Sequence, residues 1–302
     1  MKAAFLGTPS AAVPSLASLL QIADVEIVVT MPPKPQGRHR RLVDPPVAQA
    51  AGEWGLPTVK PVSSGALTAA LTDLELDVAV VVAYGRILKP AALATARVGF
   101  VNAHFSLLPR WRGAAPVERA ILAGDEITGV SLMLIDEGLD TGPVIAAHET
   151  DVADDETGGS LTGRLGDIAA GLFSDVLPDF VRGRRTPAPQ IETGAVPAPR
   201  LKKAEAVLDL EAGAEVMARQ VRAFHPRPGA WISIDGVRLK VLKVRVADVG
   251  VPPGRLEVVE GLPFLGSALG AVELLAVQPA GRSVLTGREW ANGRRGAAGI
   301  AD

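Results

Sequence analysis

The sequence predicts an α/β protein in which a Rossmann-like domain with a largely parallel sheet precedes a smaller β-barrel domain. In the first part, short apolar runs alternate with helix-like segments, which is the pattern of βαβ units. A stretch with four prolines between residues 187 and 199 then interrupts the pattern. Roughly five or six short β-like runs follow, separated by turn residues, as in a small barrel. We place the first domain at residues 1–185, a Pro-rich linker at 186–204 and the second domain at 205–302.

The expected strands of the first domain are short, apolar and bounded by turn residues. Such runs form parallel sheets through right-handed crossovers, and binding sites lie beyond the carboxyl ends of the strands. Gly7 ends the first strand, but no G-x-G-x-x-G motif follows, so we expect no dinucleotide. We expect the strands AAFLG, VEIVVT, LDVAVVVAY, VGFVNAH and VSLMLI, with helices near 10–20, 45–53 and 65–73, over AAPVERAILAG, and over 160–181.

The second domain begins with a helix candidate near residues 211–223. The β-like runs AWISID, VRLKVLKVRV, GRLEVVE and AVELLAV follow it. Residues 1–199 carry 16 Lys and Arg against 22 Asp and Glu, whereas residues 200–302 carry 15 against 11. This asymmetry is expected where the second part touches a polyanion, and chance variation of the surface explains it about equally well.

Composition excludes several classes of protein and site. The chain has no cysteine, which excludes disulfides, thiolate metal sites and a cysteine nucleophile. No apolar run reaches the roughly 18–20 residues that a membrane span requires, so we expect a cytoplasmic protein without membrane contact. A signal peptide is the alternative for the N-terminus, but the turn at Gly7-Thr8-Pro9 interrupts its apolar run. No histidine pair has the spacing of a zinc site, so we predict no metal, and we expect a monomer.

The segment GFVNAH holds the first candidate catalytic residues. Asn102 and His104 are two positions apart on an expected strand, so both side chains point to the same side at its carboxyl end. Asp140 follows between Gly138 and Gly142, where a turn brings a carboxylate within reach of a cleft. Alone, each residue is typical of a strand end, a structural histidine or a turn. Together, an amide, an imidazole and a carboxylate are the groups that transfer an acyl group to an amine.

The run N-x-H-x-S-L-L-P at 102–109, with an aspartate 36 residues after its histidine, resembles the signature of formyltransferases that use 10-formyltetrahydrofolate. SLLPRWRGAAP and GLDTG are similar to the members of that family that act on methionyl-tRNA. The resemblance covers nearly the whole chain, through FLGTP, VVAYGRIL, VRAFHPRPGAW and LLAVQPAG. It implies a formyltransferase domain, an OB-like second domain that binds tRNA, 10-formyltetrahydrofolate as co-substrate, and initiator methionyl-tRNA as acceptor in translation initiation.

The resemblance also implies a role for each matching residue. Asn102 and a protonated His104 would stabilise a tetrahedral oxyanion, and Asp140 would accept the proton of the amine through a water. The segment after the strand would hold a pterin, because this flat and partly apolar ring fits between leucine side chains and backbone polar groups. The predicted folate contacts are Ser106, Leu107, Leu108, Pro109, Tyr84 and Gly85; for Tyr84, packing at a strand end is an equal alternative.

A basic cluster in KPQGRHRRL, at residues 34–42, follows the second expected strand. A solvated loop is the simplest interpretation of such a cluster. In the family, a basic loop at this place approaches the acceptor end of the initiator tRNA, where phosphate contacts would give affinity. The chain departs from the family pattern in MPPKPQ, after FLGTP and in the linker, which affects only the details of the linker and of the tRNA-side contacts. The predicted tRNA contacts are Lys34, Arg38, Arg40 and Arg41.

Three other functions remain open from the sequence. A formyltransferase of the same catalytic type could use a small amine, such as glycinamide ribonucleotide or an amino-sugar nucleotide, although the basic loop and the second domain argue against it. A hydrolase that releases formate from the same folate would use water as the nucleophile, and no sequence feature distinguishes such a hydrolase from a transferase. The third alternative is a non-catalytic RNA-binding protein. The complete set of Asn, His and Asp argues against it, because such a protein needs no catalytic residues.

Overall fold

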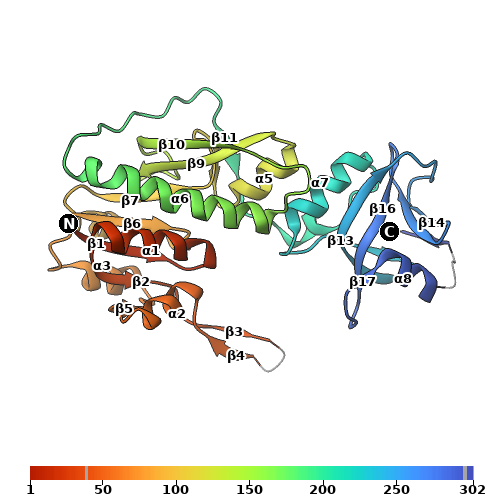
Figure 1. The fold of residues 1–302 in the computed structure, drawn as a ribbon, viewed down its shortest axis with the longest axis horizontal. Coiled ribbons are helices and arrows are strands. Elements are labelled where there is room, and N and C mark those ends of the chain that lie inside the picture. Colours follow the sequence, from red (N-terminus) through yellow and green to blue (C-terminus); the bar gives the residue numbers. More distant parts are fainter. Residues whose placement is uncertain (38–39, 295–297, 302) are drawn as a thin grey trace. The chain divides into compact units, whose positions relative to one another are not determined.

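The computed structural model describes residues 1–37, 40–294 and 298–301. The chain forms two compact units (Figure 1). Unit 1 consists of Met1–Pro116, Ile127–Asp151 and Thr162–Ala198, and unit 2 of Val117–Glu126, Val152–Leu161 and Pro199–Asp302. The continuous domain boundaries proposed from the sequence stay a prediction.

Unit 1 is built on a seven-stranded sheet in the order β10-β9-β7-β6-β1-β2-β5. Neighbouring strands are parallel from β5 through β7, whereas β9 is antiparallel to β7 and β10 is antiparallel to β9. The predicted Rossmann-like, largely parallel sheet is therefore confirmed. Its strands are β1 (Lys2–Gly7), β2 (Asp24–Val29), β5 (Thr58–Val59), β6 (Val78–Val82), β7 (Phe100–His104), β9 (Ile127–Leu134) and β10 (Val144–Asp151).

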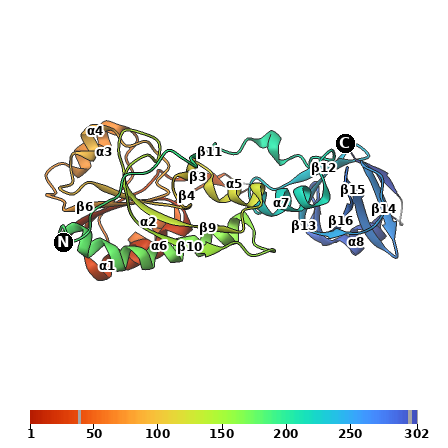
Figure 2. The ribbon, with the colours of Figure 1, turned by 90° about the horizontal axis from the view of Figure 1, so that it is seen from above.

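Helices cover both faces of this sheet, which is why β6 is buried along its whole length. Figure 2 shows α1 and α6 on one side of the sheet and α3 and α4 on the other. Ser18 of α1 donates to the carbonyl of Ala170 in α6 at 2.7 Å, and Ser63 caps the start of α3 by accepting from Ala66 N–H. The helices are η1 (Ser10–Ala12), α1 (Val13–Ile22), α2 (Pro46–Glu53), α3 (Ser64–Leu71), α4 (Pro90–Leu93) and α6 (Gly158–Val181), of which α6 belongs to unit 1 from Thr162 onward.

Two short pairings of unit 1 were not expected from the sequence. Where a loop was predicted at residues 34–42, β3 (Lys34–Gln36) pairs in antiparallel fashion with β4 (Arg41–Val43) as a hairpin. The Pro-rich stretch is tied down where β11 (Val196–Ala198) pairs in parallel with β8 (Arg110–Gly113). Ala198 makes this pairing possible because its carbonyl accepts from the N–H groups of Ala114 and Ala115, at 2.8 and 3.2 Å.

Unit 2 contains an antiparallel sheet in the order β12-β13-β16-β15-β14-β18, with β17 beside β16. A bridge between Ile234 and Ala301 brings its two ends together, so the sheet is barrel-like and nearly closed, as predicted. Met217, Val221 and Phe224 of α7 pack into its core. Its elements are α5 (Pro116–Ala123), η2 (Lys203–Ala206), α7 (Ala214–Phe224), β12 (Trp231–Ile234), β13 (Val237–Ala247), β14 (Arg255–Val259), β15 (Leu262–Gly266), β16 (Ala271–Pro279), β17 (Leu285–Thr286), α8 (Gly287–Gly293) and β18 (Gly299–Ile300). Across the described parts of both units, every helix is too short or too polar to cross a bilayer.

Candidate active site

The carboxyl end of β7 carries two of the three predicted catalytic residues. Asn102 pairs in register with Val81 of β6 and Met133 of β9, and His104, the last residue of the strand, pairs with Ser131. Their spacing of two residues places both side chains on the same face. The strand lies inside the sheet, so the site stands on a rigid element with a neighbour on each side.

His104 is buried, with 5% of its surface exposed, and its imidazole is fixed by a backbone group. Nε2 lies 2.8 Å from the carbonyl oxygen of Trp111. A carbonyl only accepts, so Nε2 carries a proton and donates it. Nδ1 faces Asp140 Oδ2 at 3.6 Å, which is longer than a hydrogen bond. The ring nitrogen left for a reacting group is therefore Nδ1.

The side-chain amide of Asn102 makes no hydrogen bond to any residue that the structure describes, and the side chain is half-buried. Its two N–H donors are thus available at the same strand end as His104. A free amide donor close to a charged or polar partner is the arrangement that can stabilise an oxyanion.

Asp140 lies on the loop between β9 and β10, and its side chain is 18% exposed. It adopts a left-handed backbone conformation, with φ of 53°, which suits an Asp in a tight turn. Oδ2 accepts from the backbone N–H of Gly113 at 2.9 Å, so the carboxylate is held toward His104. A side chain at position 142 would overlap with the carbonyl oxygen of Leu134, which explains the glycine there.

Gln190 holds the Asp140 loop and was missed from the sequence. Its Nε2 donates to the carbonyls of Asp140 and Gly142, at 2.9 and 2.7 Å. Its Oε1 accepts from Arg112 Nε at 2.9 Å, and Arg112 also pairs with the exposed Glu192. A glutamine in a Pro-rich stretch carries no sequence signal for this role, because the contact spans 50 residues.

The segment that leaves β7 folds back on Ser131 of β9. Ser131 Oγ donates to the carbonyl of Ser106 at 2.8 Å and accepts from Leu108 N–H at 3.0 Å. The Ser106 hydroxyl is fully buried and donates to the carbonyl of Arg110 at 2.6 Å, so it shapes the segment. Leu107, Leu108 and Pro109 are half-buried, with part of each surface open to solvent. The folate contacts assigned to these four residues stay a prediction.

Tyr84 and Gly85 follow β6, the parallel neighbour of β7. The Tyr84 side chain is 2% exposed and packs among core residues such as Leu6 and Val81. Its hydroxyl has no partner among the described residues, and burial raises the pKa of this phenol. Thr8 Oγ1 donates to its carbonyl at 2.8 Å, and Gly85 has φ of 89°. The packing alternative for Tyr84 matches this burial, and the predicted folate contact of the pair stays a prediction.

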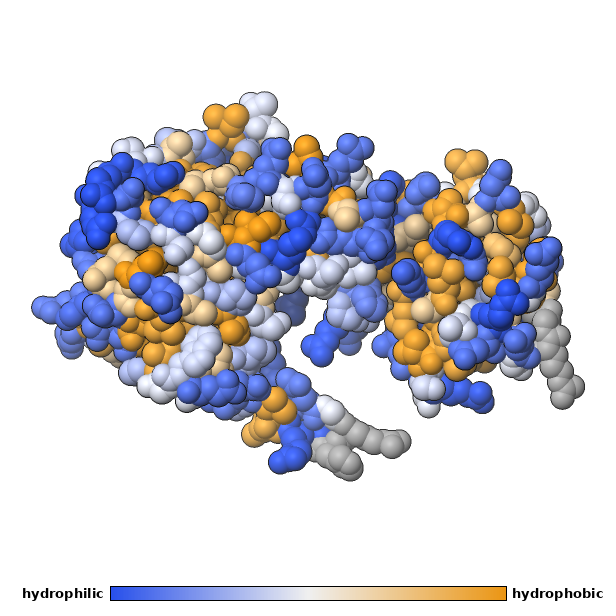
Figure 3. Space-filling model, in the orientation of Figure 1, coloured by the Kyte–Doolittle hydropathy of each residue, from blue (hydrophilic) through white to orange (hydrophobic). Residues whose placement is uncertain are grey.

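The basic cluster lies on the β3–β4 hairpin, which follows the carboxyl end of β2. Lys34, Arg40 and Arg41 are exposed and form no ion pair with the described residues, and Leu42 beside them is 69% exposed. In Figure 3 the hairpin projects from its unit with hydrophilic and hydrophobic residues both on its surface. Arg38 lies outside the described residues. The tRNA contacts predicted here stay a prediction.

No metal site emerges from the described ranges, 1–37, 40–294 and 298–301, because no three His, Asp or Glu side chains gather there. The site as described offers a free amide, an oriented imidazole and a restrained carboxylate, all at the carboxyl edge of the sheet. These groups can stabilise an oxyanion and move a proton.

Comparison with known proteins agrees with this chemistry. The family described as "Formyl transferase" matches residues 1–177, and "Formyl transferase, C-terminal domain" matches residues 200–295. A methionyl-tRNA formyltransferase of Halorhodospira halophila is 44% identical over 297 residues, covering 96% of each chain. One from Jannaschia sp. is 43% identical and covers 99% of each chain.

Solved structures share the fold at low identity. An N-formyltransferase of Helicobacter canadensis, in complex with folinic acid and dTDP-3-aminofucose, has a TM-score of 0.70 at 18% identity, covering 92% of this chain and 99% of that one. HypX of Aquifex aeolicus, in complex with tetrahydrofolic acid, has a TM-score of 0.66 at 17% identity and covers 96% of this chain and 47% of its own. At these identities the likeness concerns the fold alone.

Proposed function

Since the chain belongs to the formyl transferase family, we propose that it transfers the formyl group of 10-formyltetrahydrofolate to the α-amino group of methionine on initiator tRNA. The observation that carries the proposal is the meeting of Asn102, His104 and Asp140 at one strand end. The match to methionyl-tRNA formyltransferases over nearly the whole chain supports this acceptor. We place the reaction in the cytoplasm and expect a monomer to perform it.

The proposed reaction begins when the amine nitrogen attacks the formyl carbon, and a tetrahedral oxyanion forms. Asn102 donates its free amide N–H to this oxygen, and His104 donates from Nδ1 when its ring is protonated at both nitrogens. Because the Nδ1 and Oδ2 atoms are 3.6 Å apart, an approaching amine or water can contact both. Asp140 takes the amine proton, the oxyanion re-forms the carbonyl as the bond from carbon to N10 breaks, and the proton held by Asp140 passes to N10 as tetrahydrofolate leaves.

We assign folate binding to the segment after β7. Leu107 and Leu108 offer partly exposed apolar side chains next to the catalytic strand end, and the turn that carries them is held by Ser131. Such a segment can cover one face of a pterin while its backbone groups bond the ring edge. Gly85, at the neighbouring strand end, leaves room for a ligand because it has no side chain.

Two basic surfaces support an RNA acceptor, each in its own unit. The hairpin of unit 1 presents unpaired Lys34, Arg40 and Arg41. Unit 2 has a groove of about 640 Å³ in which Arg238 stacks over the ring of Trp231, 4.1 Å from its centroid. Cations track a phosphate backbone, and an aromatic ring can stack a base. The other charged residues that line the groove are Lys203, Lys240 and Arg282.

The experiment that tests the function compares acceptors. The protein is incubated with 10-formyltetrahydrofolate and, separately, with charged initiator tRNA, elongator methionyl-tRNA and glycinamide ribonucleotide, and transferred formyl and free formate are both measured. We expect transfer to initiator methionyl-tRNA and little formate without an acceptor. Preferential use of the small amine, or formate release at the same rate with and without an acceptor, would show that the assignment is wrong.

A side-chain test addresses the groove of unit 2. Replacing Lys240 and Arg282 with Ala should raise KM for methionyl-tRNA and leave the folate Kd unchanged, because both residues lie in unit 2 while the predicted folate contacts lie in unit 1. An unchanged KM at several salt concentrations would remove the groove from tRNA binding.

A further inference from the structure

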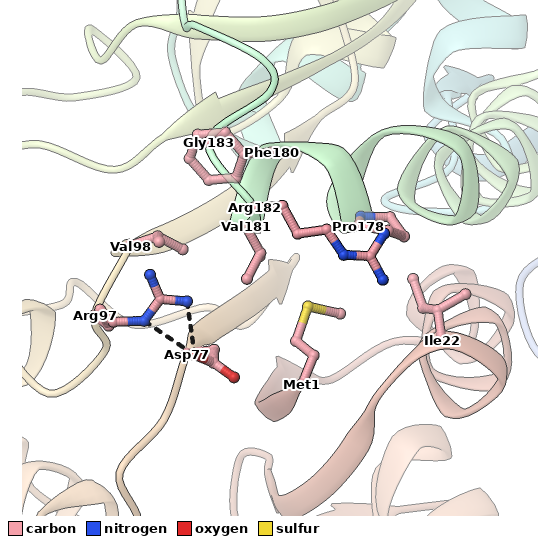
Figure 4. Close-up of a pocket in the computed structure, with 10 residues that line it drawn as sticks. All are labelled: Met1, Ile22, Asp77, Arg97, Val98, Pro178, Phe180, Val181, Arg182 and Gly183. Carbon is pink, nitrogen blue, oxygen red and sulfur yellow. Dashed lines mark hydrogen bonds and ion pairs between the residues drawn. The ribbon is translucent and has the colours of Figure 1, made fainter.

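A pocket of unit 1 lies at the edge of the sheet opposite the candidate active site (Figure 4). Asp77 directly precedes β6, Val98 lies two residues before β7, and Met1 precedes β1. These three strands are parallel, so the pocket is at their amino ends, whereas Asn102 and His104 are at the carboxyl end of β7. The ends of two helices, α1 at Ile22 and α6 at Val181, complete it.

The pocket has the size and lining of a small-molecule site. Its volume is about 620 Å³, within the range of ligand pockets. One part of its wall is apolar and comes from Met1, Ile22, Val98, Phe180 and Val181. Figure 4 shows the side chains of Met1 and Val181 between Arg97 and Arg182, two arginines from different parts of the chain. An apolar wall with a few charged groups is the composition that orients a ligand.

The charges of the lining leave one cation uncompensated. Arg97 donates from Nε and Nη2 to Asp77 Oδ1, at 3.0 and 2.7 Å, and Lys2 N–H donates to Oδ2 at 3.0 Å. Asp77 is thereby neutralised within the wall. The guanidinium of Arg182 forms no hydrogen bond or ion pair with any described residue, and Nη1 of Arg97 also remains free.

The helix end beside Arg182 does not cancel this charge. The carbonyls of Pro178, Asp179 and Phe180 would face the pocket as partial negative charges if they were bare. They accept instead from the backbone N–H groups of Arg182, Arg184 and Gly183. The free donors of the two arginines therefore make the pocket cationic, together with the α-ammonium of Met1, which pairs with the exposed Asp24 at 3.8 Å.

We propose that this pocket binds a small organic anion with an apolar body. The anionic group, a carboxylate or a phosphate ester, lies between Arg97 and Arg182, and the apolar body lies against Met1, Ile22 and Phe180. A guanidinium presents a planar fork of donors that matches either anion. The binding does not depend on formyl transfer, because the pocket is at the other edge of the sheet.

The chain offers a direct probe of this pocket. It contains four methionines, and Met1 lines the pocket, while Met31, Met133 and Met217 lie elsewhere. Met133 pairs with Asn102 in the sheet, Met31 packs near Tyr84, and Met217 is in the core of unit 2. The experiment is a titration of the full chain, labelled with ¹³C at the methionine methyl groups, with sodium hexanoate. Single Met→Leu variants at the three other positions assign the signals.

We expect a saturable shift of the Met1 methyl signal alone. Neutral 1-hexanol lacks the anionic group, and acetate lacks the apolar chain. Each should therefore bind at least about 10-fold more weakly than hexanoate. Arg182→Ala should weaken hexanoate by about 10-fold, and Arg182→Lys should bind between the wild type and Arg182→Ala, because it keeps the charge and loses the fork. Arg185→Ala, which changes a nearby exposed arginine outside the lining, should bind normally. A parallel titration with hexyl phosphate shows by its Kd which of the two anionic groups is preferred.

Three results would overturn the proposal. Hexanol could bind as tightly as hexanoate, which would make the site merely apolar. Arg182→Ala could leave the Kd unchanged, which would remove the arginine from recognition. The shift could occur at Met31 or Met133 instead of Met1, which would place the anion at the catalytic edge. None of these readouts uses formyl transfer, so failure here leaves the proposed function as it stands.

Discussion

Replacement of Gln190 tests whether the position of Asp140 controls catalysis. Gln190→Ala removes both hydrogen bonds to the backbone of the Asp140 loop, to the carbonyls of Asp140 and Gly142. The hydrogen bond from Gly113 N–H to Asp140 Oδ2 remains, so the carboxylate keeps one anchor. The loop then samples positions in which Asp140 faces away from His104. The protein should still fold, because Gln190 lies in a surface stretch and is only half-buried.

The size of the effect follows from the two lost hydrogen bonds. Each contributes about 1 kcal/mol net. Their loss therefore raises the free energy of the loop conformation in which Asp140 faces His104 by about 2 kcal/mol relative to other conformations of the loop. If only the placed loop reacts, kcat falls by roughly 30-fold. The folate Kd should change by less than about twofold, because no contact of Gln190 reaches the predicted folate segment. Gln190→Glu, which keeps the acceptor for Arg112 but loses the donor, should lower kcat at least as much.

The assay measures kcat with saturating methionyl-tRNA and 10-formyltetrahydrofolate, with the folate Kd measured separately. Glu192→Ala is the matched control: Glu192 also binds Arg112, but it is 81% exposed and does not touch the Asp140 loop. It should change kcat by less than about twofold. If Gln190→Ala and Glu192→Ala behave alike, the Gln190 bonds do not position the carboxylate and the reasoning fails.

Three further predictions concern catalysis, RNA and stability. Asn102→Ala and Asp140→Ala should each lower kcat by at least about 100-fold with little change in the folate Kd, and near-normal turnover would exclude that residue. Replacing Arg40 and Arg41 with Ala should flatten the salt dependence of tRNA use by roughly one log–log unit per lost phosphate contact; an unchanged slope would mark a solvated surface. Hydrogen bonds from Arg97 and from Lys2 N–H lower the pKa of Asp77, so its carboxylate stabilises the fold above its unfolded pKa of about 3.9. The amount by which the urea midpoint exceeds that of Asp77→Asn should be constant from about pH 7 to about pH 5 and shrink as pH falls below about 4; a difference that stays constant down to about pH 3 would contradict this.

The sequence predicts the catalytic pair because strand geometry alone decides its placement. A strand ending in VNAH puts Asn102 and His104 on one face whatever the rest of the fold does. The place of Asp140 follows less directly, since it depends on a loop whose glycines signal a turn but not its direction. Its left-handed φ and its bond to Gly113 N–H appear only when β8 is in place.

The missed features share a physical reason: they depend on backbone groups or on distant partners. The hydrogen bond of His104 ends on a carbonyl, that of Trp111, and any residue type supplies a carbonyl. The β3–β4 hairpin was missed because its strands are largely exposed and have no apolar alternation. β10 is half-exposed and polar toward its end, so its composition does not identify it as a strand. Its pairing with β9 defines it instead.

The chain does not divide cleanly at its Pro-rich stretch, and this bears on how the second domain can be tested. Arg119 binds both carboxylate oxygens of Glu205, at 2.6 and 3.2 Å, and Arg222 donates to the carbonyl of Glu156 at 3.0 Å. Two segments that precede residue 162, Val117–Glu126 and Val152–Leu161, thus have their partners after residue 199. A fragment that ends near residue 190 would lose those partners and β11 as well, so a loss of activity would reflect folding and RNA contact together. Substitutions on the surface of the unit 2 groove separate the two, because they remove charge from the proposed RNA path and leave every one of these anchoring contacts intact.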